Sequence, residues 1–145
     1  MTGNSIRELI LLAVLAAVRP AAQALGAGVH RSPTVAITRD QSPALVVFPE
    51  GEQITERAND RVTRELTLRI VALARAVPPT APETEADRLI TAAHAALLAN
   101  ANLGGLALGI REQECEWEVD DADAVAAAIP ARYQISYRTL ASDLS

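Results

Sequence analysis

The chain has 145 residues, of which 50% are hydrophobic and 21% charged, so it suits one folded domain and is not a disordered chain. Its 13 basic and 18 acidic residues give a formal net charge of −5 at pH 7. That charge argues against sequence-independent nucleic-acid binding, which needs a basic surface. All of the basic residues are arginines, which suit bidentate pairing with carboxylates across interfaces.

The sequence predicts a first helix near the start of the chain. Ser5 and Glu8 have the spacing of a capping box, directly before an apolar run. The helix is expected to run to Val18 or to the mid-20s, with Pro20 marking a bend or an end.

Residues 9–18 of this helix carry no charge. Ten residues are too few to span a bilayer, so no membrane contact is expected. The run also resembles the apolar centre of a signal peptide, but an acid before it and Arg19 after it favour a capped helix. Because the run is apolar on all sides, we expect it to pack against another copy or another protein. The residues expected to make this contact are Leu11, Leu12 and Leu15.

Strand-like runs follow the first helix. Gly26 and Gly28 close the helix, and residues 29–38 then form a strand that Pro33 interrupts. A proline removes a backbone donor, so this strand is predicted to lie at a sheet edge or to begin irregularly.

An antiparallel hairpin is predicted next. Residues 44–48 make a short apolar strand, and residues 62–77 alternate apolar and polar side chains, which is the period of a half-buried strand. The polar stretch 52–61 between them is predicted to be a long exposed loop. Residues 50–59 of this region are expected to be mobile in the free protein and ordered on its partner.

A second helix is predicted to end near Ala99. Thr80 with Glu83, or Thr84 with Asp87, has the spacing of a capping box. A single apolar stripe predicts that this helix packs on a sheet by one face. The stripe consists of Ala86, Leu89, Ile90, Ala93 and Leu97.

Two further strands complete the predicted fold. In residues 106–119 the apolar positions change from even to odd, which predicts a bulge or a sharp twist near residues 109–113. An acidic, alanine-rich connection at 120–128 leads to a last strand at residues 131–139. The order of elements indicates one α+β domain over residues 1–145, with a mostly antiparallel sheet of about five strands and two main helices packed on one face.

The most distinctive feature is an acidic residue at every even position from 112 to 120. Because the side-chain period of a strand is two, these carboxylates are predicted to project from one face, with neighbours roughly 6.5–7 Å apart. Charges this close repel each other. A solvated outer face explains the row without a function, whereas an arginine-bearing partner or a channel that must stay negative explains it with one. The row consists of Glu112, Glu114, Glu116, Glu118 and Asp120.

Catalytic, metal and cofactor chemistry is not expected. His30 and His94 are not spaced as a ligand pair, and His94 is interpreted as a structural histidine beside the apolar stripe. Cys115 is expected to be a buried, inert thiol; with either histidine it gives a nucleophile pair in principle, but no local signature supports one. The glycines fit no phosphate-binding loop, and carboxylates along a strand do not converge on a cation.

Five segments together carry a family resemblance. They are SIRELI at residues 5–10, PALVVFPEGE at 43–52, RELTLRI at 64–70, LGGL at 103–106 and YQISYRT at 133–139. In this order and spacing they resemble the tail terminator proteins of long-tailed bacteriophages, the family that includes the minor tail protein U of phage lambda. The resemblance covers nearly the whole chain and rests on segment order rather than on any one motif.

This resemblance implies a structural virion protein rather than an enzyme. Copies of the chain are expected to form a ring, as a hexamer, that caps the finished tail tube, stops its polymerisation and presents a surface to the head–neck connector proteins. The implied location is the tail–neck junction of the virion, after assembly in the cytoplasm of a bacterial host. DNA passes through such a ring without specific binding, and no cofactor is involved.

Within such a ring the acidic row has two possible environments. It lines the passage, where carboxylates repel DNA phosphates, or it meets arginines of a neighbouring copy. The carboxylates concerned are Glu112, Glu114, Glu116 and Glu118. The candidate arginine partners, near the polar stretch, are Arg57, Arg61 and Arg64.

Three other functions stay open at this point. A head–tail connector or another minor tail protein is a different ring in the same particle. A small ligand-binding or regulatory α+β domain predicts a stable monomer or dimer with a concave apolar pocket. A small hydrolase that uses Cys115 or His30 predicts a thiol that reacts at neutral pH.

Overall fold

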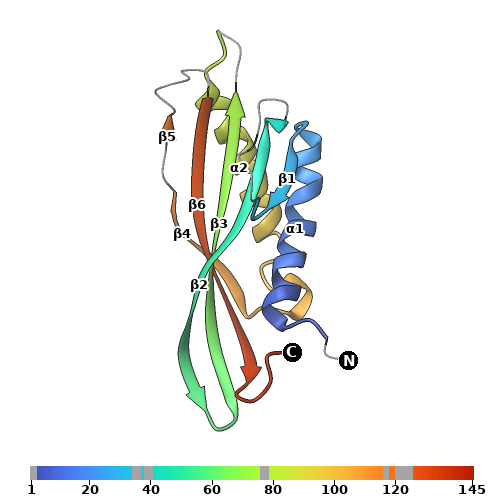
Figure 1. Ribbon diagram of the computed structural model, residues 1–145, viewed down its shortest axis with the longest axis vertical. Helices are drawn as coiled ribbons and strands as arrows, with labels where there is room; N and C mark the ends of the chain where they lie inside the picture. The colour runs from blue at the N-terminus through green and yellow to red at the C-terminus, as the bar shows by residue number, and fades with distance from the viewer. Residues whose placement is uncertain (1–2, 34–36, 38–40, 76–78, 116–117, 120–125) are drawn as a thin grey trace.

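The chain folds into two helices on one face of a twisted sheet, as a computed structural model shows (Figure 1). The structure describes residues 3–33, 37, 41–75, 79–115, 118–119 and 126–145. The elements are α1 (Ile6–Ala24), β1 (Gly28–Arg31), β2 (Ala44–Ala58), β3 (Arg61–Arg75), α2 (Pro82–Leu98), the 3-10 turn η2 (Leu103–Gly105), β4 (Gly109–Cys115), β5 (Glu118–Val119) and β6 (Ala126–Leu140).

The sheet in the described part of the chain has six strands, one of them only two residues long. The strand order is β1-β2-β3-β6-β4, and β5 pairs with β6. Every pair is antiparallel except β1 with β2. The predicted α+β class is therefore confirmed, as is the edge position of the first strand.

α1 begins and ends at the residues that carry its sequence signals. The Ser5 hydroxyl accepts a hydrogen bond from the Glu8 amide at 3.2 Å, which makes Ser5 the N-cap. Pro20 does not end the helix, which continues to Ala24; Pro20 is exposed, so water can reach the carbonyl that its ring leaves without a donor. Gly26 then closes the helix with a φ of 73°, a left-handed conformation that glycine adopts without strain.

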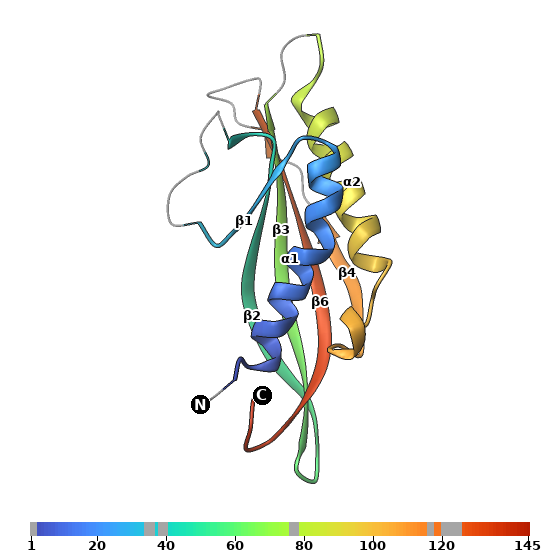
Figure 2. The same cartoon turned by 90° about the vertical axis from the view of Figure 1, so that its right-hand side faces the viewer.

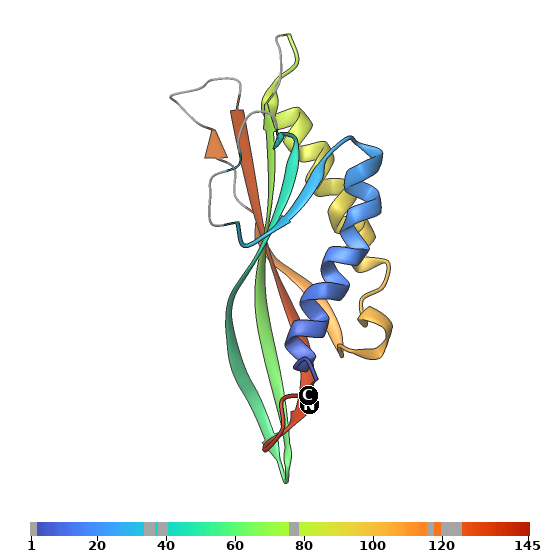
Figure 3. The same cartoon turned by 45° about the vertical axis from the view of Figure 1, so that its right-hand side comes forward.

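The hairpin of β2 and β3 corrects the predicted loop. β2 does not end after residue 48 but runs for 15 residues, and residues 52–58 are paired with β3. A two-residue turn at Asn59 and Asp60 joins the strands, so the expected mobile loop at residues 50–59 is wrong. We call residues 51–65 the arm; the turn end of this part of the hairpin extends beyond the helices (Figure 3).

The core lies between the helices and the sheet. Even-numbered side chains of β3 and odd-numbered side chains of β6 face the helices, and the predicted stripe of α2 is buried there. Both predicted capping boxes of α2 are wrong, because Ala81 is its N-cap and makes no side-chain hydrogen bond; Pro82, with its preset φ, opens the helix instead. No helix among the described residues has the length and hydropathy that crossing a membrane requires.

The strand predicted over residues 106–119 is divided into β4 and β5. The register between β4 and β6 shifts between Glu112 and Glu114, so the predicted bulge is confirmed. β6 begins at Ala126, so it is longer than predicted and includes residues 126–128 of the predicted acidic connection; residues 120–125 of that connection lie outside the described residues.

The C-terminal residues lie against the first turn of α1 and the base of the hairpin turn (Figure 2). The Ile6 amide donates to the Leu144 carbonyl at 2.8 Å, and the Ala141 amide donates to the Asp60 carbonyl at 2.7 Å. These bonds tie the end of the chain to both the helix layer and the arm.

Candidate functional site

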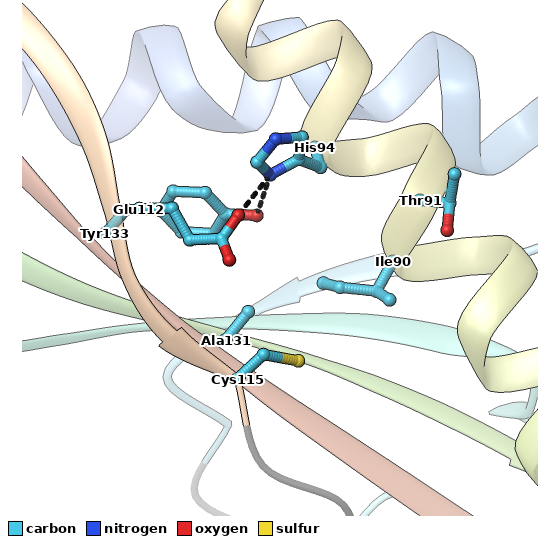
Figure 4. A pocket seen from close by; sticks show the side chains of 7 residues that line it. All are labelled: Ile90, Thr91, His94, Glu112, Cys115, Ala131 and Tyr133. Carbon is cyan, nitrogen blue, oxygen red and sulfur yellow. Dashed lines mark hydrogen bonds and ion pairs between the residues drawn. The ribbon is translucent and has the colours of Figure 1, made fainter.

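An open pocket of about 180 Å³ lies where α2 faces β4 and β6 (Figure 4). Its floor is apolar, and each of these three elements contributes polar groups to its lining. The helix supplies its side chains because α2 packs on the sheet by its buried stripe, which turns the neighbouring positions toward the β4 edge. The lining residues are Ile90, Thr91, His94, Glu112, Cys115, Ala131 and Tyr133.

His94 connects the polar groups of this pocket. Its Nδ1 lies 2.9 Å from the Tyr133 hydroxyl and 3.2 Å from a Glu112 carboxylate oxygen (Figure 4). Burial raises the pKa of Tyr133 above its ordinary value, and the nearby negative charges of Glu112 and Cys115 raise it further. The predicted structural role of His94 is consistent with these contacts, which join α2 to Tyr133 of β6 and to Glu112 of the edge strand β4.

The expectation that the acidic row shares one face is wrong for its first two members. Glu112 pairs across the strands with Tyr133 and faces α2, whereas Glu114 pairs with Arg132 on the opposite face. The bulge between them reverses the alternation that a regular strand would keep. Glu116 and Asp120 lie outside the described residues, and β5 places only the backbone of Glu118.

On the helix-free side of β6, Arg132 joins two acidic residues from different strands. Its Nε lies 2.8 Å from Glu50, and its Nη1 lies 2.7 Å from Glu114. Hydrogen bonding to Glu50, and then to Glu114, raises the pKa of Arg132. Glu114 therefore has a partner within its own chain, on β6.

Cys115 differs from its prediction in burial. It is exposed and forms part of the pocket wall, so it is not the buried thiol that we expected. It lies in the same pocket as His94, whose Nδ1 is directed at Tyr133 and Glu112.

The base of the arm is held by a cluster around Glu52. This carboxylate accepts hydrogen bonds from Arg7 of α1 at 3.0 Å, from Arg64 of β3 at 3.2 Å and from the Tyr137 hydroxyl of β6. Burial, and then the bond to Glu52, raise the pKa of Tyr137 above its ordinary value. Three elements that are distant in sequence therefore meet at one carboxylate.

The three candidate arginines differ in whether they already have partners within the chain. Arg64 is committed within its own chain, to Glu52 and to the Thr139 hydroxyl. Arg57 and Arg61 are exposed near the end of the arm and form no ion pair among the residues that the structure describes.

The three candidate leucines of α1 differ in burial. Leu11 and Leu15 are buried in the core of the single chain, because α2 and the sheet cover that side of α1. Leu12 is 43% exposed and is the one of the three that a partner can reach. The helix that is apolar on all sides is therefore largely satisfied within one chain.

Sequence reasoning missed Glu52 and Arg132, each of which takes part in two ion pairs. Their partners lie 12 to 85 residues away along the chain, so no local spacing marks them. An acidic residue within a hairpin strand would have pointed to Glu52, but residues 52–61 were predicted to be a loop, so Glu52 was not recognised.

Comparison with known proteins gives a likeness in fold. No family profile matches the sequence, and no curated protein matches it. Among solved structures, a chain from the virion of a native gene transfer agent particle is similar, with a TM-score of 0.58 and 12% identity. The likeness covers 93% of this chain and 92% of that chain. At this identity it shows a shared fold across nearly the whole of both chains.

Proposed function

We propose that this chain is a structural protein of a phage-like virion and, more specifically, a tail terminator whose copies form a ring on the end of the tail tube. The observation that carries the proposal is the fold shared with a chain of the gene transfer agent virion, over 93% of this chain. The segment order that resembles tail terminators supports the finer assignment.

The charged arm provides surface for such a ring. Arg57 and Arg61 lack ion-pair partners among the described residues, and Glu112 and Glu114 remain about half exposed although each has an internal partner. We assign the arm arginines to contacts with acidic residues of a neighbouring copy. Glu116 and Glu118 are assigned either to the same contact or to the lumen, where they would repel DNA phosphates.

The remaining partners follow from the same role. One face of the ring contacts the tail tube protein and the other contacts the head–neck connector proteins, and exposed Leu12 is a candidate for either. In this role the protein forms a hexamer at the tail–neck junction, and DNA passes through the ring without specific binding. The role requires no catalytic residue, metal or cofactor.

Two alternatives are weighed against this proposal. A head–tail connector is also a ring of the same particle, and the shared fold supports it equally; binding to portal-side proteins instead of tube protein would favour it. A ligand-binding domain would need a larger site than the pocket beside α2, whose volume of about 180 Å³ is less than the roughly 300–1,000 Å³ of ordinary small-molecule sites.

The test is direct imaging of the purified protein with and without cognate tail tubes. The proposal predicts rings of one diameter at the ends of tubes and tubes that no longer elongate. Bare tube ends that continue to grow at saturating protein concentration would contradict it.

A further inference from the structure

The arm presents a large exposed apolar side chain, Ile54, beside Arg57, which forms no ion pair within the described part of the chain. Ile54 is 42% exposed, and its strand partner is Arg64, whose side chain lies on the helix side of the sheet. Arg57 pairs across the strands with buried Val62, so it projects from the same side. The bulge between Ile54 and Glu56 places Ile54 and Arg57 two steps apart along β3, about 6.5–7 Å.

The pocket beside α2 has the complementary arrangement. Its floor contains apolar Ile90 and Ala131, with Cys115 beside them, and its rim carries Glu112, whose side chain is 47% exposed. The bulge between Glu112 and Glu114 places Glu112 and Cys115 two steps apart along β6, again about 6.5–7 Å. An apolar group and a charge thus have the same spacing on both surfaces.

We infer that the arm of one copy docks in the α2–β4 pocket of the next copy, with Ile54 on the apolar floor and Arg57 at Glu112. The inference rests on the proposed ring and names the surfaces that form it. Both surfaces lie on the helix side of the sheet, and the pocket volume of about 180 Å³ suits an inserted side chain rather than a separate ligand.

The positions of the two surfaces determine the kind of assembly. The pocket is built on β4 at one end of the strand order, whereas the arm belongs to β2 and β3 and extends away beyond the helices (Figure 1). When each arm enters the pocket of the next copy, the contact is heterologous and repeats from copy to copy, and it forms a ring where the rotation closes. Two copies that instead exchanged arms reciprocally would form a closed two-fold dimer, so the size of the assembly distinguishes the two arrangements.

Cross-linking tests this contact, because Cys115 is the single cysteine of the chain and lies in the pocket wall. Ile54→Cys is expected to form disulfides with Cys115 of the next copy under mild oxidation. Non-reducing gels should then show a ladder of dimers, trimers and larger species that a thiol reductant collapses. Gln53→Cys is the matched control, because this neighbouring residue is exposed on the opposite face of the arm and should give no ladder.

A charge exchange tests the contact without a cysteine. Arg57→Glu and Glu112→Arg should each weaken self-association by about tenfold or more in sedimentation velocity, and the double variant should restore most of it. Far-ultraviolet circular dichroism confirms that each variant is folded.

The outcomes separate this inference from the proposed function. Rings or capped tubes without the Ile54→Cys ladder, or without charge rescue, overturn the docking contact and leave the ring. A ladder that stops at the dimer also overturns it, because two copies would then exchange arms reciprocally and the contact could not continue to a next copy. Neither rings nor a ladder at any concentration, with or without tubes, overturns both.

Discussion

Replacing Glu52 by Gln tests whether side-chain bonds keep the arm as an ordered strand rather than a mobile loop. The change preserves the side-chain shape but removes the charge that Arg7, Arg64 and Tyr137 share. We expect lower stability of the folded chain and faster opening of the β2 half of the arm, because this half would lose the charged side chain that bonds it to α1 and to Tyr137 of β6, while the β3 half stays paired with β6.

The expected magnitude follows from how well each partner is shielded. The Glu52 and Arg64 side chains are only 14% and 13% exposed, so their charge-assisted bond should contribute about 1.5–3 kcal/mol. Arg7 is 41% exposed and should add only a few tenths of a kcal/mol because water screens it. The amide oxygen of the Gln variant can still accept one hydrogen bond, so we expect a loss of about 2–3 kcal/mol in total.

Urea unfolding at a concentration where the protein is monomeric measures this loss as a shift in midpoint at constant slope. Amide hydrogen exchange should show faster exchange at residues 53–58 than in the unaltered chain. Glu56→Gln is the control, since Glu56 is exposed on the same arm and forms no ion pair among the described residues; its effect should stay within about 0.5 kcal/mol. A Glu52→Gln change within that same limit, with unaltered exchange, would refute the reasoning.

Three further outcomes are expected. Tyr133 and Tyr137, the two tyrosines of the chain, have raised pKa values in the fold, so their contribution to stability is complete below about pH 10 and declines above it, by up to about 1.4 kcal/mol per pH unit for each. Phenolate absorbance measures this, and a folded protein that titrates near pH 10 would contradict it. Leu15→Ala should cost about 2–4 kcal/mol in urea unfolding whereas Leu12→Ala costs under about 0.5, and equal losses would argue against the described packing of α1. Gly26→Ala should lower stability by about 1 kcal/mol because of its positive φ, so an unchanged melting curve would contradict the described helix end.

Where tertiary packing agreed with local pattern, the sequence predicted the fold correctly. The alternation in β3 marked the side that the helices cover, and the apolar stripe of α2 marked its buried face. Ser5 acts locally, through one hydroxyl, so its spacing from Glu8 was sufficient to place the start of α1, whereas its end was predicted only as Val18 or the mid-20s. The change of parity before residue 119 correctly indicated a bulge.

The arm was missed because nothing local distinguishes it from a loop. Its β2 half is exposed on nearly every residue, so it lacks apolar alternation, and Pro49 and Gly51 ordinarily indicate a turn. Pairing with β3 and the long-range bonds to Glu52 keep it extended. Local propensity carries no information about such contacts.

The pocket was missed for a related reason. Its polar groups come from three elements that the fold brings together, and the bulge in β4 decides that Glu112 faces the pocket while Glu114 does not. A period of two cannot locate the residue at which the alternation reverses.

Images of the purified protein incubated with cognate tail tubes test the central proposal most directly. We expect closed rings of a single diameter seated on tube ends, and tubes that stop growing once capped. Protein that remains monomeric at every concentration and leaves the tube ends bare would contradict it.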